Sequence, residues 1–225
     1  MNPIVAIPEY LQTNNTVSTR RTMTEALLAA DVVPVVLPEM DDASADAVLA
    51  HCGAVMVGGG IPLQDYDRRC AFEDRVIELA VKRGLTIVGI CHGSQVIDRH
   101  FGGTLSPVPE ESKSIHKDDA LYGRTGERAE HFAMVLPGDS LMARVFGEGL
   151  VRINSNHTMR CETLATGFRA TALSEVDDVI EAFEHETLPI RGFQFHPEIY
   201  WQKDGRFLEL IRMAIEGGAR RRTLQ

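Results

Sequence analysis

Short apolar runs alternate with stretches of helical spacing through the first half of the chain. Runs at 4–7, 32–37, 54–57 and 85–90 are β-branched or continuously apolar and predict strands. The segments 22–30, 46–51, 72–83 and 94–101 lie between or after them and predict helices. Because strands alternate with helices, this half predicts βαβ units on a parallel sheet.

The second half has a different pattern, with many strands and few helices. Strands are predicted at 132–136, 150–153, 168–173, 179–185 and 190–195, and a closing helix at 207–215. The segment 107–130 is polar and charged, and we expect a long surface loop of the kind that often forms a functional lid. We therefore expect one α/β domain over residues 1–225, with a mostly parallel sheet first and antiparallel additions later.

Composition narrows the possible function classes. The formal net charge of −9 argues against nonspecific nucleic-acid binding, which needs a basic surface. No apolar stretch reaches the roughly 18 residues of a membrane helix, and the N-terminus lacks the pattern of a signal peptide. The four cysteines are widely spaced without a C-x-x-C pair, which fits neither a zinc knuckle nor a disulfide framework. We expect a cytoplasmic protein with reduced thiols.

One cysteine lies in the sequence context of a catalytic nucleophile. The apolar strand 85–90 leads into Gly89-Ile90-Cys91-His92-Gly93, and a helix is predicted directly after it. This is the strand–turn–helix arrangement of a nucleophile elbow, with Cys in place of Ser. A free cysteine is more often a buried hydrophobic residue, but the flanking glycines favour the elbow. We expect the helix N-terminus to lower the thiol pKa of Cys91.

A base for this nucleophile is predicted in the segment FQFHPE at 193–198. His196 and Glu198 are two residues apart, so their side chains would point the same way along an extended chain. Glu198 would then orient the imidazole of His196, as the third member of a triad does. His-x-Glu alone is a weak signal, and only together with the elbow does it predict catalysis.

The two motifs GICHGSQ and FQFHPE, in this order, resemble the class I (triad) glutamine amidotransferase superfamily. Within it the chain looks closest to the γ-glutamyl-γ-aminobutyrate hydrolase group, peptidase family C26. DRRCAFEDRVIELA, HFGGTL, INSNH and VIEAFEHETLPIRGFQFHPE also resemble segments of that group. The resemblance implies a flavodoxin-like three-layer sandwich with a central, mostly parallel sheet.

The resemblance also implies roles for individual residues. Cys91 would be the nucleophile, His196 the base and Glu198 the orienting carboxylate. The other implied roles are an oxyanion hole from the backbone of Gly59, Gly60 and His92, and substrate contacts from Gln95, Asn154, Ser155 and His157. As alternatives to substrate contact, Gln95 could be an ordinary polar residue of the helix, and Ser155 and His157 could be turn residues of a hairpin.

Some positions depart from the family pattern. His92 and Ser94 replace the usual Arg and apolar residue after the nucleophile, and Ile61 and Pro62 shorten the loop after the glycines. These positions border the leaving group, so the departures leave the amine that is released undefined. His92 would add a polar group at the mouth of the pocket.

The function expected from this pattern is hydrolysis of a small γ-glutamyl amine through a γ-glutamyl thioester. We expect no cofactor and no metal, because the other histidines (His51, His100, His116, His131 and His185) are scattered without ligand spacing. We expect no nucleic-acid or membrane partner, and a homodimer is the default assembly. Two alternatives stay open: a glutaminase subunit that delivers ammonia to a separate synthetase partner, and a non-catalytic relative that keeps the fold.

Overall fold

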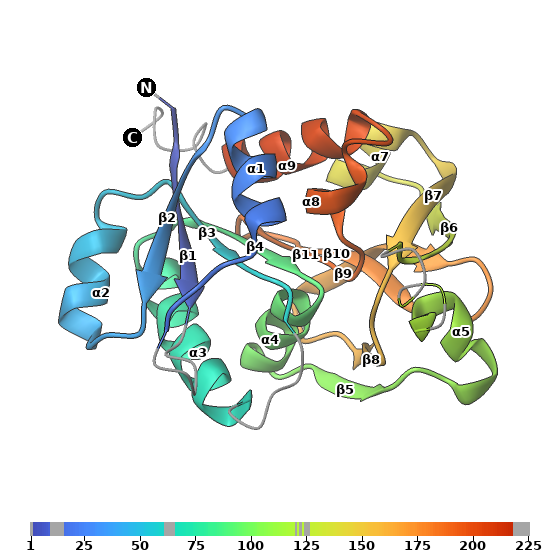
Figure 1. Cartoon of the computed structure of the whole chain (residues 1–225), viewed down its shortest axis with the longest axis horizontal. Coiled ribbons are helices and arrows are strands. Elements are labelled where there is room, and N and C mark those ends of the chain that lie inside the picture. Colours follow the sequence, from blue (N-terminus) through green and yellow to red (C-terminus); the bar gives the residue numbers. More distant parts are fainter. Residues whose placement is uncertain are drawn as a thin grey trace.

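The protein is described by a computed structural model over residues 2–9, 16–60, 66–119, 121, 123 and 127–217, with the backbone alone at 66–68. Ile61 and Pro62, the predicted departures after the glycines, lie outside these residues. A nine-stranded sheet runs through the molecule. It consists of β1 (Ile4–Glu9), β2 (Val33–Pro38), β3 (Ala54–Val57), β4 (Thr86–Ile90), β6 (Ala129–Val135), β7 (Gly149–Ser155), β9 (Phe168–Ser174), β10 (Ile180–His185) and β11 (Ile190–Phe193). Their order across the sheet is β2-β1-β3-β4-β11-β10-β9-β6-β7 (Figure 1).

The sheet has a parallel half and an antiparallel half. β2, β1, β3, β4 and β11 pair in parallel, and the pairs from β11 through β10, β9, β6 and β7 are antiparallel. This confirms the predicted flavodoxin-like arrangement with antiparallel additions. Antiparallel neighbours need only short turns, whereas each parallel neighbour needs a crossover, and this is why helices are concentrated in the first half.

Helices cover both faces of the sheet and form a three-layer sandwich (Figure 1). They are α1 (Arg21–Ala29), α2 (Asp42–Leu49), α3 (Tyr66–Lys82), α4 (His92–His100), α5 (Lys113–His116), α7 (Leu141–Phe146), α8 (Pro197–Tyr200) and α9 (Arg206–Glu216). One core contains buried residues of α1, α8 and α9 with α7, and the opposite core contains those of α2, α3 and α4. Alternate residues of β1 divide between the cores, since Ile7 faces the first and Ala6 the second.

The segment 107–130 differs from the surface loop that the sequence predicts. It leaves β5 (Thr104–Pro107), which pairs with β8 (Met159–Thr163) in a separate two-stranded sheet, and it contains the 3₁₀ helix Glu110–Ser112 and α5 before β6 begins. His116 of α5 is fully buried although its neighbours in the sequence are charged. The surface-loop prediction is therefore wrong for this part, because α5 packs against β6 through that buried side chain.

Within the described residues, no helix is both long enough and apolar enough to cross a bilayer. The longest of them, α3, carries charged residues along much of its length.

Candidate active site

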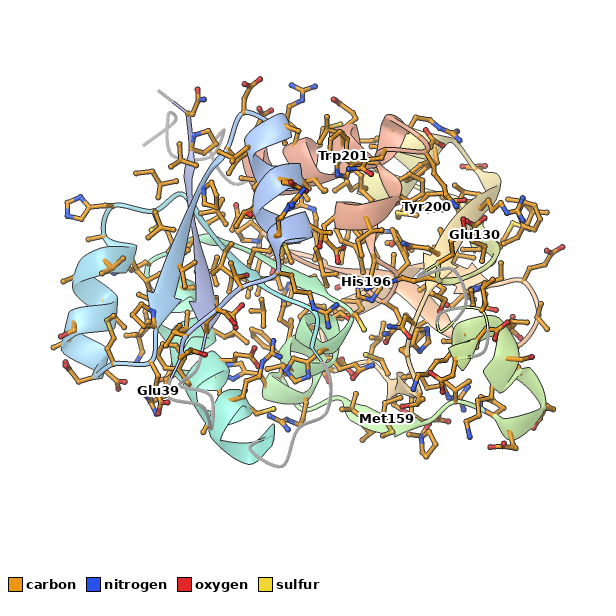
Figure 2. The ribbon with its side chains drawn as sticks, viewed as in Figure 1. Glu39, Glu130, Met159, His196, Tyr200 and Trp201 are labelled. Atoms are coloured by element: carbon orange, nitrogen blue, oxygen red, sulfur yellow. The ribbon has the colours of Figure 1, made fainter. Side chains whose placement is uncertain are left out.

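The predicted site residues meet where three parallel strands end. Gly58–Gly60 follows β3, Cys91 follows β4, and His196 comes three residues after the end of β11. These strands are direct neighbours, so their carboxyl ends bring the three segments together. His196 lies near the middle of the molecule (Figure 2).

Cys91 sits on a sharp turn between β4 and α4. Its φ of 52° and ψ of −106° are unusual for a residue with a side chain. The carbonyl of Cys91 accepts hydrogen bonds from the backbone N–H of Ser94 at 3.1 Å and of Gln95 at 3.2 Å, which starts the helix directly. At Gly93 a β-carbon would lie 2.0 Å from the carbonyl oxygen of Val57, so only glycine fits. These features form the predicted nucleophile elbow.

His196 and Glu198 form a buried pair. Nδ1 of His196 lies 2.8 Å from Oε1 of Glu198, and both side chains are almost fully buried. The backbone that joins them differs from the prediction, because Pro197 begins helix α8 where an extended chain was expected. Proline is favoured at the first position of a helix, and the tight turn still directs the carboxylate back to the ring. Nε2 of His196 has no hydrogen-bond partner among the described residues, so it is available to a proton donor.

Asn154 holds the backbone of His196 in place. Its side-chain amide donates to the carbonyl of His196 at 3.1 Å and accepts from the backbone N–H of His196 at 3.0 Å. Both ends of the amide are thereby occupied. The structure thus places Asn154, at the end of β7, against the backbone of His196.

Gly59 lies against the side chains of Cys91 and His196. A β-carbon at this position would be 3.0 Å from Cε1 of His196 and 3.8 Å from Cβ of Cys91. The two side chains therefore face the same small space beside Gly59. The backbone N–H of His92 interacts with the sulfur of Cys91 and favours its thiolate, as a donor at the predicted oxyanion hole would.

The protonation states of the triad follow from burial. Burial raises the pKa of Cys91 to about 11, with the charge of Glu198 adding to the shift. Burial also lowers the pKa of His196, which Glu198 offsets only in part. Burial acts to raise the pKa of Glu198, but the attraction of His196 and its hydrogen bond lower it overall. The predicted lowering of the thiol pKa is wrong, because burial is the largest influence on Cys91 and the nearby positive charges and the backbone hydrogen bond from His92 offset it only in part.

A cavity of about 400 Å³ opens over Cys91 and His196. Of the predicted residues, Cys91, His196, Gly60, His92, Gln95 and His157 line it, whereas Gly59, Asn154, Ser155 and Glu198 do not. Three cationic residues that sequence reasoning missed also line it: Arg20, Arg99 and Lys117. Arg99 lies four positions after Gln95 on α4, a spacing that places both on one helix face. Arg20 and Lys117 come from separate segments and gave no comparable signal.

The side chain of His92 points into a buried ion pair. Its Nε2 lies 2.9 Å from Oε2 of Glu73, whose Oε1 accepts a hydrogen bond from Nε of Arg69 at 2.8 Å. Arg69 also donates to the carbonyl of Gly58 at 3.2 Å. His92 is therefore buried and fixed, not free at the mouth of the pocket. Arg69 and Glu73 are four residues apart on α3, and this spacing would have allowed the ion pair to be predicted from the sequence.

The other predicted substrate contacts lie around Met159. Gln95 donates through Nε2 to the carbonyl of Met159 at 2.8 Å and to Oε1 of Gln194 at 3.0 Å. The ring of His157 bonds the same carbonyl through Nδ1 at 3.0 Å. Ser155 is fully buried at the end of β7. Contact of these residues with a substrate stays a prediction.

Comparisons with known proteins place this site in a wider group. The Peptidase C26 family matches residues 3–198. A protein of Schizosaccharomyces pombe, provisionally named a glutamine amidotransferase, is 25% identical over 95% of this chain and 85% of its own length. A subunit of the glutamine-hydrolysing GMP synthase of Thermococcus kodakarensis is 35% identical over 53% of this chain and 54% of its own. The crystal structure of a glutamine amidotransferase from Thermotoga maritima superposes with a TM-score of 0.66 at 15% identity, covering 97% of this chain and 98% of that one, and supports the fold.

Proposed function

The chain belongs to the peptidase C26 family, and we propose that Cys91, His196 and Glu198 hydrolyse the γ-glutamyl amide bond of a small γ-glutamyl amine. The observation that carries this proposal is the constellation itself. A cysteine on a strained elbow faces the same space as an imidazole nitrogen that has no hydrogen-bond partner among the described residues. A buried carboxylate orients the imidazole. Family membership supports amide-bond hydrolysis, and the cavity supports a small substrate.

The reaction begins from the neutral pair. As the sulfur of Cys91 attacks the γ-carbonyl carbon, its proton passes to Nε2 of His196, and Glu198 stabilises the imidazolium that forms. The oxyanion is held by backbone N–H groups of His92 and of the turn at Gly59 and Gly60. His196 then protonates the amine as the C–N bond breaks, which leaves a γ-glutamyl thioester.

Water completes the turnover. It attacks the thioester carbonyl while His196 takes its proton, and the C–S bond breaks to release glutamate. The proton returns from His196 to the sulfur of Cys91. No atom from a cofactor enters this sequence.

Recognition of the glutamyl group is assigned to the polar wall of the cavity. Both hydrogen bonds of the Gln95 side chain are made by its Nε2, so its side-chain oxygen accepts none of the described hydrogen bonds. This oxygen is suited to accept a hydrogen bond from the α-ammonium group of the substrate. Arg20, Arg99 and Lys117 supply positive charge for the α-carboxylate. Asn154 we assign as a positioning residue that acts through the backbone of His196.

The test is glutamate release by the purified protein alone, from free glutamine and from a panel of γ-glutamyl amines. Cys91→Ala should abolish release. The matched control is Cys161→Ala, because Cys161 is also a buried thiol but does not line the cavity. Hydroxylamine added during turnover should yield γ-glutamyl hydroxamate from the thioester. If no panel member is turned over, or if Cys91→Ala retains activity, the proposal fails.

The second candidate is a glutaminase subunit that passes ammonia to a synthetase. Similarity to the GMP synthase subunit of Thermococcus kodakarensis over about half of this chain favours it. Under this alternative the isolated protein should release little glutamate from any amide, and a synthetase partner should raise glutamine hydrolysis. Substantial turnover of γ-glutamyl amines by the protein alone would exclude it.

A further inference from the structure

Three histidines and a glutamate form a buried cluster beside the carbonyl of Met159. His116 comes from α5, His131 from β6, His157 from the turn after β7, and Glu181 from β10. All four side chains are buried. The ring centroid of His116 lies 4.8 Å from that of His131 and 4.7 Å from that of His157. The triad chemistry uses none of these four side chains directly.

The outer hydrogen bonds of two histidines determine which ring nitrogens carry a lone pair. Nδ1 of His157 lies 3.0 Å from the carbonyl oxygen of Met159, which only accepts, so Nδ1 carries the hydrogen. Nε2 of His116 lies 3.1 Å from the carboxylate of Asp177 and likewise donates. In the neutral rings, Nε2 of His157 and Nδ1 of His116 are therefore lone pairs. They face Oε1 of Glu181 at 3.8 Å and 3.5 Å.

This arrangement leaves buried acceptors facing one another. Nδ1 of His116, Nε2 of His157 and Oε2 of Glu181 have no hydrogen-bond partner among the described residues. A buried polar atom without a partner is costly, and a cation placed between these three atoms would satisfy all of them.

We propose that His116, His157 and Glu181 bind one divalent transition-metal ion of the Zn²⁺ type. Each of these residues offers one ligand atom, and the three atoms lie within 4.8 Å of one another. With metal–ligand bonds of about 2.0–2.1 Å, neighbouring ligands of a tetrahedral ion are roughly 3.4 Å apart. The distances of 3.5 Å and 3.8 Å to Oε1 of Glu181 are close to that value. Small shifts of the side chains would complete the site, and water would supply the fourth ligand.

The residues around the cluster match the outer contacts of a metal site. Metal-binding histidines commonly donate their second ring nitrogen to a carboxylate or a backbone carbonyl, as His116 does to Asp177 and His157 to Met159. His131 donates through Nε2 to Oε1 of Glu181 at 3.0 Å and would orient the ligating carboxylate.

Such an ion would act on the catalytic cavity through its wall. His157 lines the cavity, and the carbonyl of Met159 holds both His157 and Gln95. The ion would also fix α5 to the main sheet, because His116 is the buried contact of that helix. It lies outside the reacting atoms, so its role is structural.

The test is metal binding by the full chain, independent of activity. The purified protein is stripped with a chelator and titrated with Zn²⁺, and separately with Co²⁺, whose visible absorption reports tetrahedral coordination. We expect one equivalent to bind, a higher unfolding temperature with Zn²⁺, and loss of both effects in Glu181→Gln and His116→Gln. Asp177→Asn should still bind, about 10–100-fold more weakly.

The matched control is Glu73→Gln, which removes a carboxylate from the other buried group of potential ligands, Cys70, Glu73 and His92. It should leave the stoichiometry unchanged. The proposal is overturned if the wild-type protein binds neither ion, which needs no variant to fold, or if Glu73→Gln loses the ion while Glu181→Gln keeps it. If neither ion binds, protons shared between the histidine rings and the carboxylate satisfy these groups, and no metal is bound.

Discussion

Replacing Glu198 with Gln tests how the triad stabilises charge. The substitution preserves the size of the side chain but removes the charge 2.8 Å from Nδ1 of His196, in a buried environment. When His196 accepts the proton of Cys91, its positive charge lies about 4 Å from the centre of the carboxylate, an interaction of about 4 kcal/mol at an effective dielectric constant near 20. At about 1.4 kcal/mol per decade, we expect kcat/KM to fall roughly 10³-fold.

Two assays measure different parts of this change. The first is kcat/KM for glutamate release from a γ-glutamyl amine that the wild-type protein hydrolyses. The second is the pH profile of Cys91 alkylation, because the charge of Glu198 raises the thiol pKa. Glu198→Gln should therefore move alkylation to lower pH while turnover falls. A general loss of structure would not produce these opposite effects.

The matched control is Glu130→Gln, which removes a carboxylate that bonds Tyr200 and Lys203 and does not line the cavity. It should change kcat/KM little. A fall of less than tenfold in folded Glu198→Gln would refute the charge-stabilisation role, and so would a shift of alkylation to higher pH.

Three further predictions concern positioning, packing and pH. Asn154→Ala removes two buried hydrogen bonds to the catalytic histidine, and each is worth about 1 kcal/mol; kcat should fall more than KM rises, and an unchanged kcat would contradict the positioning role. Gly93→Ala places a methyl group 2.0 Å from the carbonyl oxygen of Val57, and urea denaturation should show a free energy of unfolding lower by about 3 kcal/mol or more. The control is Gly205→Ala, where the space is open and the free energy of unfolding should change little. Burial raises the pKa of Glu9 from 4.5 to about 7, so the folded state holds the extra proton in that window and stability falls as pH rises from 4.5 to 7. Glu9→Gln should flatten that dependence in denaturation curves at pH 5 and pH 8, and an unchanged slope would show that another group causes it.

The alternation of apolar runs was sufficient to predict the sheet and its two halves. Strands such as β4 are apolar on both faces, because helices cover both, and this pattern is readable without any tertiary information. β5 and β8 were missed because they are short and partly exposed, so neither has a continuous apolar run. The 3₁₀ helix and α5 were missed because their stability comes from the burial of His116, which the local sequence does not indicate.

The convergence of Cys91, His196 and Glu198 was predictable because the two segments that carry them are short local motifs. The elbow glycines and the His-Pro-Glu segment each place a group at the end of a strand, and the sheet order then brings them together. The histidine cluster depends instead on strand register. His131 pairs with Ile153 across β6 and β7, and that register positions it beside side chains from α5 and β10. No spacing along the chain contains this information.

The pKa of Cys91 shows a different limit of sequence reasoning. The helix N-terminus behind it was visible in the sequence, whereas complete burial of the thiol was not. Burial is the largest influence on this thiol and raises its pKa. Under the proposed mechanism the thiolate forms as the sulfur attacks, by proton transfer to His196.

The backbone at Cys91 has a consequence for engineering the protein. A positive φ in a residue with a β-carbon costs on the order of 1–3 kcal/mol, and the fold tolerates this cost at the position where reactivity is needed. Glycine at this position would relieve the strain, so an inactive Cys91→Gly protein should melt at a higher temperature than Cys91→Ala. Selection for thermal stability alone would thus favour loss of the nucleophile, and a stabilised variant of this enzyme has to be selected for turnover at the same time.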